Sequence, residues 1–300
     1  MTVAAEAFAE RIRALAPDVI VQSAVYNGDG LGNDVVVVNG RLVFRFAKTE
    51  RGRAALAGEL EVLNAIRSRV ALPIPDPLFT GDGSMAYELL PGEQLSFAVL
   101  RKLPASVVET IALQLAEFLR ALHGTPASDG LPATLALARR DEWEELRRDT
   151  QALIYPLMLP HQREWAKGMF DRVLGDPRQF DDTPRVVHGD LWPEHVLFDR
   201  SAGRLSGIID FGQAGLGDPA GDLGNLLQVY GETFVRRMLP AYPEAARLLP
   251  RARCYSHARE LEWVLRGLQS GHSFWFGAHL GNARDLAGEP AARAWPQRPH

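Results

Sequence analysis

Short extended apolar runs bounded by turn residues dominate the chain up to residue 90. Such runs predict β-strands. The Asn39-Gly40 dipeptide between two of them is typical of a tight hairpin, so we expect the strands to pair antiparallel. The expected strands are Val19–Val25, Val35–Asn39, Arg41–Ala47, Phe79–Thr80 and Met85–Leu90.

Two helices accompany these strands. Phe8, Ile12 and Leu15 recur at helical spacing, and Pro17 closes that first helix. The segment Ala54–Val70 places its leucines on one face, which predicts an amphipathic helix inserted into the sheet. We therefore expect residues 1–91 to form an antiparallel-sheet lobe.

The pattern changes after Pro91-Gly92, where amphipathic helical spacing prevails. We expect residues 92–300 to form a larger, mainly helical lobe, with the Pro- and Arg-rich stretch 288–300 as a flexible tail. The fold class is then α+β, with two lobes and a cleft at their joint. Helices are expected at Val107–His123, Arg139–Leu153, Pro160–Leu174, Pro219–Tyr230, Glu232–Leu239 and Cys254–Gly271.

Composition and charge narrow the class of protein. A hydrophobic content of 46% and a charged content of 23% are typical of soluble globular chains. The net charge of −4 provides no basic field, so we expect no nucleic-acid partner. The single cysteine, Cys254, excludes an intrachain disulfide. No apolar run has the length of a membrane helix and the N-terminus lacks a signal-peptide core, so we expect a cytoplasmic protein without a membrane partner.

Two carboxylates carry the main chemical signal. Asp190 lies in an HGD loop and Asp210 in an IDFG loop, and between them lie two strand-like runs, Val196–Phe198 and Leu205–Ile209. A hairpin of that size brings its ends together, so we expect the two acids to face one cleft. Phosphoryl transfer to an alcohol uses such a pair, because one carboxylate orients the hydroxyl and accepts its proton while the other holds Mg²⁺. Asp190 fits the first role and Asp210 the second.

Other polar residues surround this pair. His195 follows Asp190 closely and is either a metal-side ligand or a hydrogen-bonding neighbour of the two acids. His188 is expected to bind main chain. Asp218 is expected to cap the helix that starts at Pro219, and Asp222 to brace the catalytic loop.

In the sheet lobe, a glycine-rich loop containing Gly28, Gly30 and Gly32 lies between two strands. Glycines allow main-chain N–H groups to approach phosphate oxygens, although any glycine-rich hairpin looks alike. Arg45, in the middle of a strand, is a candidate phosphate-binding cation that would pair with Glu59 on the helix. The alternatives are that Arg45 lies on a solvated strand face or that Lys48 is the cation.

The stretches GNDVVVVNGRLVFRFAK, GELEVLNAI, HGDLWPEHVLFD and GIIDFGQAGLGDPAGDL resemble the aminoglycoside and macrolide phosphotransferases, and most closely the aminoglycoside 2″-phosphotransferases. The resemblance implies a protein-kinase-like fold with ATP or GTP bound between the lobes. It implies Asp190 as the base, and Asp210 and His195 as Mg²⁺ ligands. It also makes the segment from Glu88 to Leu90 the hinge that binds the purine, with Tyr87 as a bulky gatekeeper that favours GTP.

The chain departs from this family at two places. Arg45 stands where the family has a phosphate-binding lysine. An arginine is always charged and can bind a phosphate through two N–H groups at once. The acidic run expected near the acceptor is replaced by Asn225–Glu232, in which only Glu232 is acidic. Trp263 and Trp275 bring an aromatic character to the last helical segment. Glu232 and these two tryptophans are the candidate acceptor contacts.

The sequence thus predicts a Mg²⁺-dependent small-molecule kinase that phosphorylates a hydroxyl of an aminoglycoside-type antibiotic with ATP or GTP. A macrolide or a metabolite alcohol is the alternative acceptor. A protein that binds nucleotide without transfer activity is the alternative from another class, because Arg45 replaces the lysine. We expect a monomer or a weak dimer.

Overall fold

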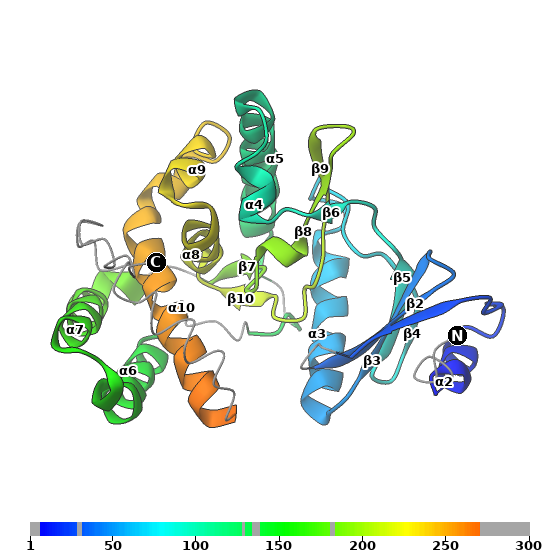
Figure 1. The fold of residues 1–300 in the computed structure, drawn as a ribbon, viewed down its shortest axis with the longest axis horizontal. Helices are drawn as coiled ribbons and strands as arrows, with labels where there is room; N and C mark the ends of the chain where they lie inside the picture. The colour runs from blue at the N-terminus through cyan, green and yellow to red at the C-terminus, as the bar shows by residue number, and fades with distance from the viewer. Residues whose placement is uncertain (1–6, 29–31, 128–129, 134–138, 181–183, 271–300) are drawn as a thin grey trace, which may run out of the picture.

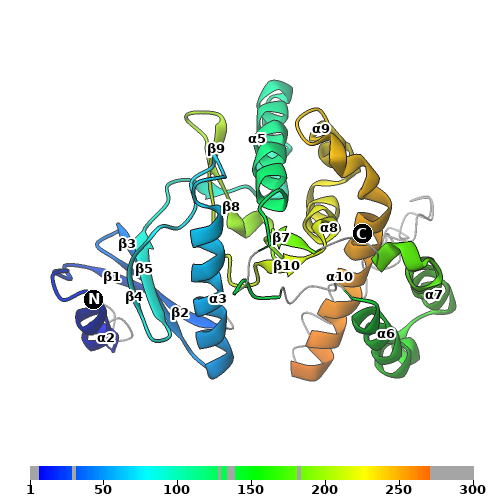
Figure 2. The ribbon, with the colours of Figure 1, turned by 180° about the vertical axis from the view of Figure 1, so that it is seen from behind.

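The computed structural model describes residues 7–270 except 29–31, 128–129, 134–138 and 181–183. A five-stranded sheet lies at one end of the molecule and helices form the other end (Figure 1 and Figure 2). The α+β class expected from the sequence is confirmed. Among the described residues, no helix combines the length and apolarity needed to cross a membrane. The tail expected at 288–300 lies outside the described residues.

The sheet has the strand order β1-β2-β3-β5-β4, and each neighbouring pair is antiparallel, as expected. The turn at Asn39 and Gly40 has φ angles of 55° and 62°, the left-handed pair that a tight hairpin requires. The strands are β1 (Ala24–Asn27), β2 (Asn33–Val38), β3 (Leu42–Ala47), β4 (Pro77–Gly81) and β5 (Ser84–Glu88).

Several boundaries differ from the expectation, and two of them have a clear physical reason. The first strand begins at Ala24 instead of Val19, because the apolar residues before it pack beside the sheet without joining it. The inserted helix, α3 (Glu50–Ile66), begins before Ala54 because the Thr49 hydroxyl accepts a hydrogen bond from the Gly52 N–H and caps it. In both views α3 lies between the sheet and the helical end (Figure 1 and Figure 2).

The two faces of β3 have different neighbours because side chains alternate along a strand. Phe44 and Phe46 pack with Ile12 of α2 (Ala9–Leu15) on one face. Val43 packs with Leu56 of α3, Met85 and Tyr87 on the other face. Arg45 lies directly opposite Met85, so it points to the α3 face.

The helical end surrounds a hairpin and a short sheet. The hairpin consists of β8 (Val196–Asp199) and β9 (Arg204–Ile208), as the sequence predicts, with β6 (Glu93–Gln94) beside β8. Strands β7 (Arg185–Val187) and β10 (Gly215–Gly217) form the short sheet. The helices are α4 (Phe97–Leu100), α5 (Ala105–His123), α6 (Arg140–Asp149), α7 (Pro160–Gly175), α8 (Pro219–Tyr230), α9 (Glu232–Arg237) and α10 (Leu249–Ser270).

Helices α8 and α10 pack closely where α8 carries a glycine. A Cβ placed on Gly224 would lie 2.7 Å from the Cβ of Tyr255 and 3.0 Å from the carbonyl oxygen of Ala252. Only glycine therefore permits this approach without a shift of one helix. The contact fixes α10 against α8, the helix that follows the Asp210 loop and β10.

Candidate active site

His195 lies between two carboxylates. Its Nδ1 is 3.9 Å from Asp190 Oδ2, and its Nε2 is 3.4 Å from Asp210 Oδ2. The main-chain carbonyl of Asp190 lies 2.7 Å from Nδ1. Because a carbonyl oxygen only accepts, Nδ1 carries a proton, and in the neutral ring Nε2 presents its lone pair toward Asp210. The hairpin therefore brings both acids to one imidazole.

The backbone of Asp210 adopts an uncommon conformation that sets the direction of its carboxylate. Its φ of 64° lies in the left-handed region, which costs a non-glycine residue about 1 kcal/mol. The next residue, Phe211, is fully buried, with its ring centroid 4.6 Å from that of His188 and 6.5 Å from that of Phe118. The buried ring anchors the loop that follows β9, so Asp210 is held in place from the core.

Arg45 joins the sheet to this loop. Its Nη1 donates to Glu59 Oε1 at 2.6 Å and its Nη2 to Asp210 Oδ1 at 3.1 Å. The expected pairing with Glu59 is confirmed, and the alternative of a solvated strand face is wrong, because Arg45 is 5% exposed. Burial alone would lower the pKa of Arg45, but the carboxylates of Glu59 and Asp210 hold it above its usual value. The guanidinium is therefore charged and points at the Asp210 loop.

Asp222 braces the catalytic loop, as expected. Its Oδ2 accepts from the His188 N–H and its Oδ1 from the Gly189 N–H, both at 2.8 Å. Nε2 of His123 lies 3.1 Å from the same Oδ2. Burial raises the pKa of Asp222, but the hydrogen bond and the charge of His123 outweigh burial and bring the pKa below its usual value. The ionised carboxylate thus fixes the main chain before Asp190.

His188 binds main chain on both sides of its ring. Nε2 lies 3.1 Å from the carbonyl oxygen of Ile209, and Nδ1 lies 3.3 Å from the N–H of Asp190. These partners specify a neutral imidazole that donates through Nε2 and accepts through Nδ1. Burial lowers the pKa of His188, consistent with the neutral form. His188 thereby ties the Asp190 loop to the Asp210 loop.

The surroundings separate the two acids electrostatically. Burial raises the pKa of Asp190, against the opposing charges of His195 and His188. Burial also acts on Asp210, but Arg45 and His195 outweigh it and lower the pKa of that carboxyl. Two carboxyl groups whose pKa values are pushed apart suit two roles, with Asp190 the better proton acceptor and Asp210 the permanent anion.

Asp210 and His195 fit a Mg²⁺ ion that also binds phosphate. Among the described residues, no group of three or more His, Cys, Asp or Glu side chains is arranged to hold a metal. Mg²⁺ commonly takes only one or two protein ligands and completes its shell with phosphate oxygens and waters. Asp210 supplies the hard oxygen, and Nε2 of His195 lies on the same side of it.

Comparison with known proteins decides the family. A family model described as "Phosphotransferase enzyme family" matches residues 24–261. The chain belongs to this phosphotransferase family. It is similar to the viomycin phosphotransferase of Streptomyces vinaceus, at 31% identity over 68% of this chain and 73% of that protein. It is also similar to the aminoglycoside 3′-phosphotransferase of Streptomyces fradiae, at 29% identity over 62% and 72% of the two chains.

A solved structure supports the same assignment. The complex of an aminoglycoside 2″-phosphotransferase with GDP and kanamycin superposes with a TM-score of 0.85 at 26% identity, covering 93% of this chain and 98% of that one. The kinase-like fold expected from the sequence is therefore confirmed. The protein is therefore an enzyme, a phosphotransferase.

The phosphotransferase holds the ends of its glycine loop through Lys48. The Nζ of Lys48 donates to the Gly28 carbonyl at 2.6 Å and lies 3.6 Å from Asp34 Oδ1, and its main-chain N–H donates to the Gly32 carbonyl at 3.0 Å. Of the two candidate cations, Arg45 reaches the Asp210 loop, whereas Lys48 reaches the glycine loop. Gly30 lies outside the described residues.

The predicted hinge begins at Glu88, the last residue of β5. Tyr87 pairs with Val43, is 6% exposed and points to the same sheet face as Arg45. Burial raises the pKa of Tyr87 to about 12. Glu88 has an exposed side chain, and Leu90 is half-buried. This phosphotransferase thus places a bulky buried side chain directly before the segment predicted to bind the purine.

The predicted acceptor contacts have partners within the chain. Both oxygens of Glu232 accept from Arg253, and Oε1 also accepts from Arg236. These arginines lower the pKa of Glu232 to about 2. A cationic acceptor that binds Glu232 would have to share its carboxylate with two guanidinium groups.

Trp263 lies beside the catalytic loop. Its ring meets that of Trp192 edge to face with centroids 6.3 Å apart, and Arg266 lies over it at 4.7 Å. Trp192 follows Asp190 in the same loop, so Trp263 borders the site where the acceptor is expected. Trp275 lies outside the described residues.

Sequence reasoning missed Arg259 of α10. Its Nη2 donates to the Gly189 carbonyl at 3.2 Å, so it touches the residue directly before Asp190. A single arginine in a helix carries no distinguishing signal, because the contact joins residues 70 positions apart in the sequence. Only the packing of α10 on α8 reveals it.

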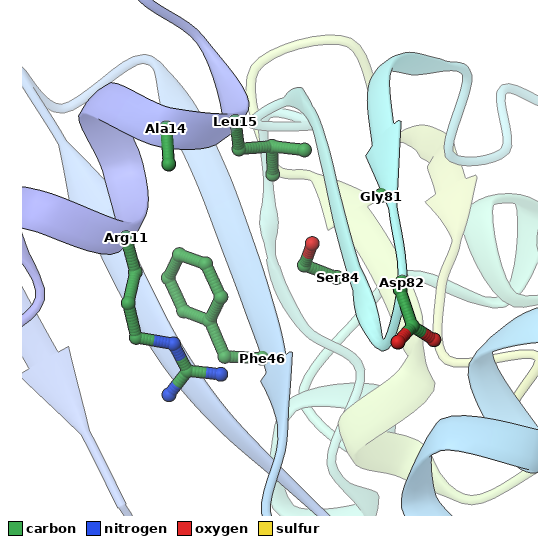
Figure 3. Close-up of a pocket in the computed structure, with 7 residues that line it drawn as sticks. All are labelled: Arg11, Ala14, Leu15, Phe46, Gly81, Asp82 and Ser84. Atoms are coloured by element: carbon green, nitrogen blue, oxygen red, sulfur yellow. The ribbon is translucent and has the colours of Figure 1, made fainter.

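A cavity of about 300 Å³ lies away from these residues, on the outer face of the sheet (Figure 3). Arg11 and Leu15 of α2 border it on one side, and Asp82 of the β4–β5 turn and Ser84 of β5 on the other. Phe46 also lines it and neighbours Arg45 on β3, so the two side chains point to opposite faces of the sheet. The cavity is therefore separated from the active-site cleft by the sheet itself.

Proposed function

We propose that this phosphotransferase transfers the γ-phosphate of ATP or GTP to a hydroxyl of an aminoglycoside-type antibiotic in a Mg²⁺-dependent reaction. The observation that carries the proposal is the placement of Asp190 and Asp210 at the two ring nitrogens of His195, 3.9 Å and 3.4 Å away. This arrangement supplies one proton acceptor and one metal-side anion at a single cleft.

Asp190 acts on the acceptor. Its carboxylate accepts a hydrogen bond from the acceptor hydroxyl, directs the oxygen at the γ-phosphorus and takes the proton. Burial raises the pKa of Asp190 and makes it a better base than an exposed aspartate. Because the transition state of phosphoryl transfer is loose, most of this contribution is positioning of the hydroxyl.

Asp210, His195 and Arg45 act on the nucleotide phosphates. Asp210 and His195 would hold Mg²⁺, which supplies positive charge that neutralises the phosphate oxygens during transfer. Arg45 is charged, buried and 3.1 Å from Asp210, so its guanidinium is preorganised at the same position. An arginine binds phosphate with a planar bidentate group, which supports activity without the family's lysine.

The acceptor is proposed from relatives and from local charge. The aminoglycoside relatives favour an aminoglycoside, and the similarity to the viomycin enzyme makes viomycin the second candidate. The α8 segment Asn225–Gln228 carries no acid, and Glu232 is already bound by two arginines. Both observations favour an acceptor with fewer positive charges, which keeps a macrolide or a metabolite alcohol as the alternative.

The test is a matrix of nucleotides and acceptors. Purified protein is incubated with MgCl₂ and either ATP or GTP, each combined with kanamycin, viomycin or a macrolide, and the acceptor mass is measured. A gain of one phosphate on kanamycin supports the proposal as stated. A gain on viomycin or a macrolide alone corrects the acceptor. Tight nucleotide binding without any phosphorylated product from the panel would contradict transfer to these antibiotics and leave a metabolite-alcohol kinase or a nucleotide-binding protein without transfer activity.

A further inference from the structure

The peptide group between Gly189 and Asp190 is held by side chains at both of its polar atoms. Its carbonyl oxygen accepts from Arg259 Nη2 at 3.2 Å, and its N–H donates to His188 Nδ1 at 3.3 Å. Just before it, the Gly189 N–H donates to Asp222 Oδ1 at 2.8 Å. The main chain that carries the Asp190 side chain is therefore fixed by three side chains.

No strand or helix ladder sets this orientation. Gly189 has a φ of 78°, in the left-handed region that favours glycine, and lies between β7 and the turn before β8. A glycine at such a position allows the following peptide to rotate at little cost. A rotation of that peptide moves the Asp190 carboxylate, so the bonds to its oxygen and nitrogen determine where the carboxylate points.

Arg259 is itself held in place. Its side chain is 13% exposed. Its Nε donates to Asn225 Oδ1 of α8 at 3.1 Å, and its Nη1 donates to Glu262 Oε2, one turn further along α10, at 3.0 Å. Burial opposes the charge of Arg259, but Glu262 and Asp190 raise its pKa above the usual value. The guanidinium is thus a charged group held by contacts with α8, α10 and the catalytic loop.

The same face of α10 continues along the loop. Arg259, Glu262, Trp263 and Arg266 follow at helical spacing, and Trp263 meets Trp192 two residues after Asp190. Helix α10 is fixed on α8 by the close contact at Gly224. A displacement of this face therefore reaches the catalytic loop through Arg259.

We propose that Arg259 is a positioning residue that sets the direction of the Asp190 carboxylate by holding the Gly189 carbonyl, and that it couples the acceptor-side helix α10 to the catalytic loop. The proposal rests on the proposed function of Asp190. A purely structural role, in which Arg259 only ties α10 to α8, would instead lower stability and leave turnover of the folded enzyme unchanged.

Three variants at Arg259 and one control separate these roles. Arg259→Met removes every donor but keeps the length of the side chain. Arg259→Gln remains polar but is too short to reach the loop, and Arg259→Lys restores a charged donor. The control is Arg140→Met, because Arg140 of α6 makes the same two kinds of bond, to the Leu174 carbonyl at 2.9 Å and to Glu144 of its own helix at 3.1 Å.

The main measurement is the steady-state rate of phosphate transfer from ATP or GTP, with kanamycin or viomycin as the acceptor, whichever the wild-type protein phosphorylates. The nucleotide Kd and the melting temperature of each variant are measured beside it. We expect Arg259→Met and Arg259→Gln to lower kcat by about 10- to 100-fold, as loss of a supporting contact commonly does, with the nucleotide Kd unchanged within about twofold. Arg259→Lys should recover most of that loss, and Arg140→Met should retain the wild-type kcat. Should Arg259→Met fail to fold, Arg259→Gln and Arg259→Lys carry the same comparison.

Two results would overturn the inference. One is a kcat of Arg259→Gln or Arg259→Met equal to that of wild type while only the melting temperature falls. The other is an equal loss of kcat in Arg259→Lys and Arg259→Met, which would mean that the loss does not come from the missing donor to the Gly189 carbonyl. If the wild-type protein transfers no phosphate to either acceptor, the proposed function fails first and the inference fails with it.

Discussion

Arg45 Nη2 lies 3.1 Å from Asp210 Oδ1, and this contact joins β3 of the sheet to the loop after β9, 165 positions away in the sequence. The same guanidinium holds Glu59 of α3. Three elements, β3, α3 and the loop after β9, therefore meet at one buried cation. Loss of this cation affects stability as well as chemistry.

Arg45→Met should destabilise the protein by about 3–5 kcal/mol, because it leaves the fully buried Glu59 without its counter-charge. Urea unfolding measures the change. The double variant Arg45→Met/Glu59→Leu should recover most of the loss, since both charges are then absent. Arg53→Met is the control, because the ion pairs that Arg53 makes within the described residues are with exposed Glu50 and Asp82, and it should cost less than about 1 kcal/mol. A single variant as stable as this control would contradict the account.

His195→Ala should raise the MgCl₂ concentration needed for half-maximal activity, because Nε2 of His195 lies 3.4 Å from Asp210 on the metal side. His195→Asn should shift the requirement less, since its amide oxygen is a donor that Mg²⁺ prefers. Activity is measured across a MgCl₂ titration at saturating nucleotide. An identical MgCl₂ dependence in wild type and His195→Ala would rule out the ligand role and leave His195 as a neighbour of the two acids.

Tyr87→Met should shift nucleotide preference toward ATP. Tyr87 is buried on the Arg45 face directly before the hinge, and a slimmer side chain opens space for the deeper position of adenine. We expect the ratio of kcat/KM for ATP to that for GTP to rise by about tenfold, the change that modest reshaping of a pocket brings. Tyr87→Phe keeps the ring and should leave the ratio unchanged. A ratio that moves equally in both variants would assign the effect to the hydroxyl instead.

His257 of α10 should make stability depend on pH. Its Nδ1 is buried and makes no hydrogen bond to the described residues, and its ring lies 5.5 Å from that of Trp165. Burial, with a smaller effect of Arg172, lowers the pKa of His257 to about 4. The unfolded chain, with a pKa near 6.5, then binds the proton more readily than the folded one, so the stabilisation is complete above about pH 6.5 and is lost as pH falls toward 4.

Titration of His257 should change the free energy of unfolding by at most about 3 kcal/mol between about pH 6.5 and about pH 4. Urea midpoints at pH 7 and pH 5 measure it, with His257→Phe as the comparison, because that variant keeps an aromatic ring without a titrating group. The midpoint of His257→Phe should fall less between pH 7 and pH 5 than that of wild type. Equal falls in the two proteins would show that other groups, such as the buried His188, account for the acid sensitivity.

Local signals in the sequence predicted the elements that carry the chemistry. The Asn39-Gly40 turn, the two strands after Asp190 and the helix that starts at Pro219 with its Asp218 cap all appear as expected. Each depends on neighbouring residues: a turn that requires positive φ, alternation over a few positions, or an N-cap. The predicted start of β1 was too early, because the apolar residues before Ala24 pack beside the sheet without joining it. The predicted start of α3 was too late, because the cap at Thr49 decides where that helix begins.

Contacts between distant segments were harder to foresee. Arg45 was a candidate cation from its place in an apolar strand, but its bond to Asp210 depends on how the sheet meets the β8–β9 hairpin. Arg259 gave no signal at all, since its partners Gly189 and Asn225 come close only through the packing of α10 on α8. Glu232 looked like an isolated acid in the sequence, whereas the fold surrounds it with two arginines.

The most direct test of the central claim is the turnover of Asp190→Asn, measured beside its nucleotide Kd. Asparagine keeps the shape of the side chain but accepts no proton, so the account predicts a kcat lower by at least about 100-fold, with a nucleotide Kd within about twofold of wild type. A kcat that stays within about tenfold of wild type would contradict the role of Asp190 as the base.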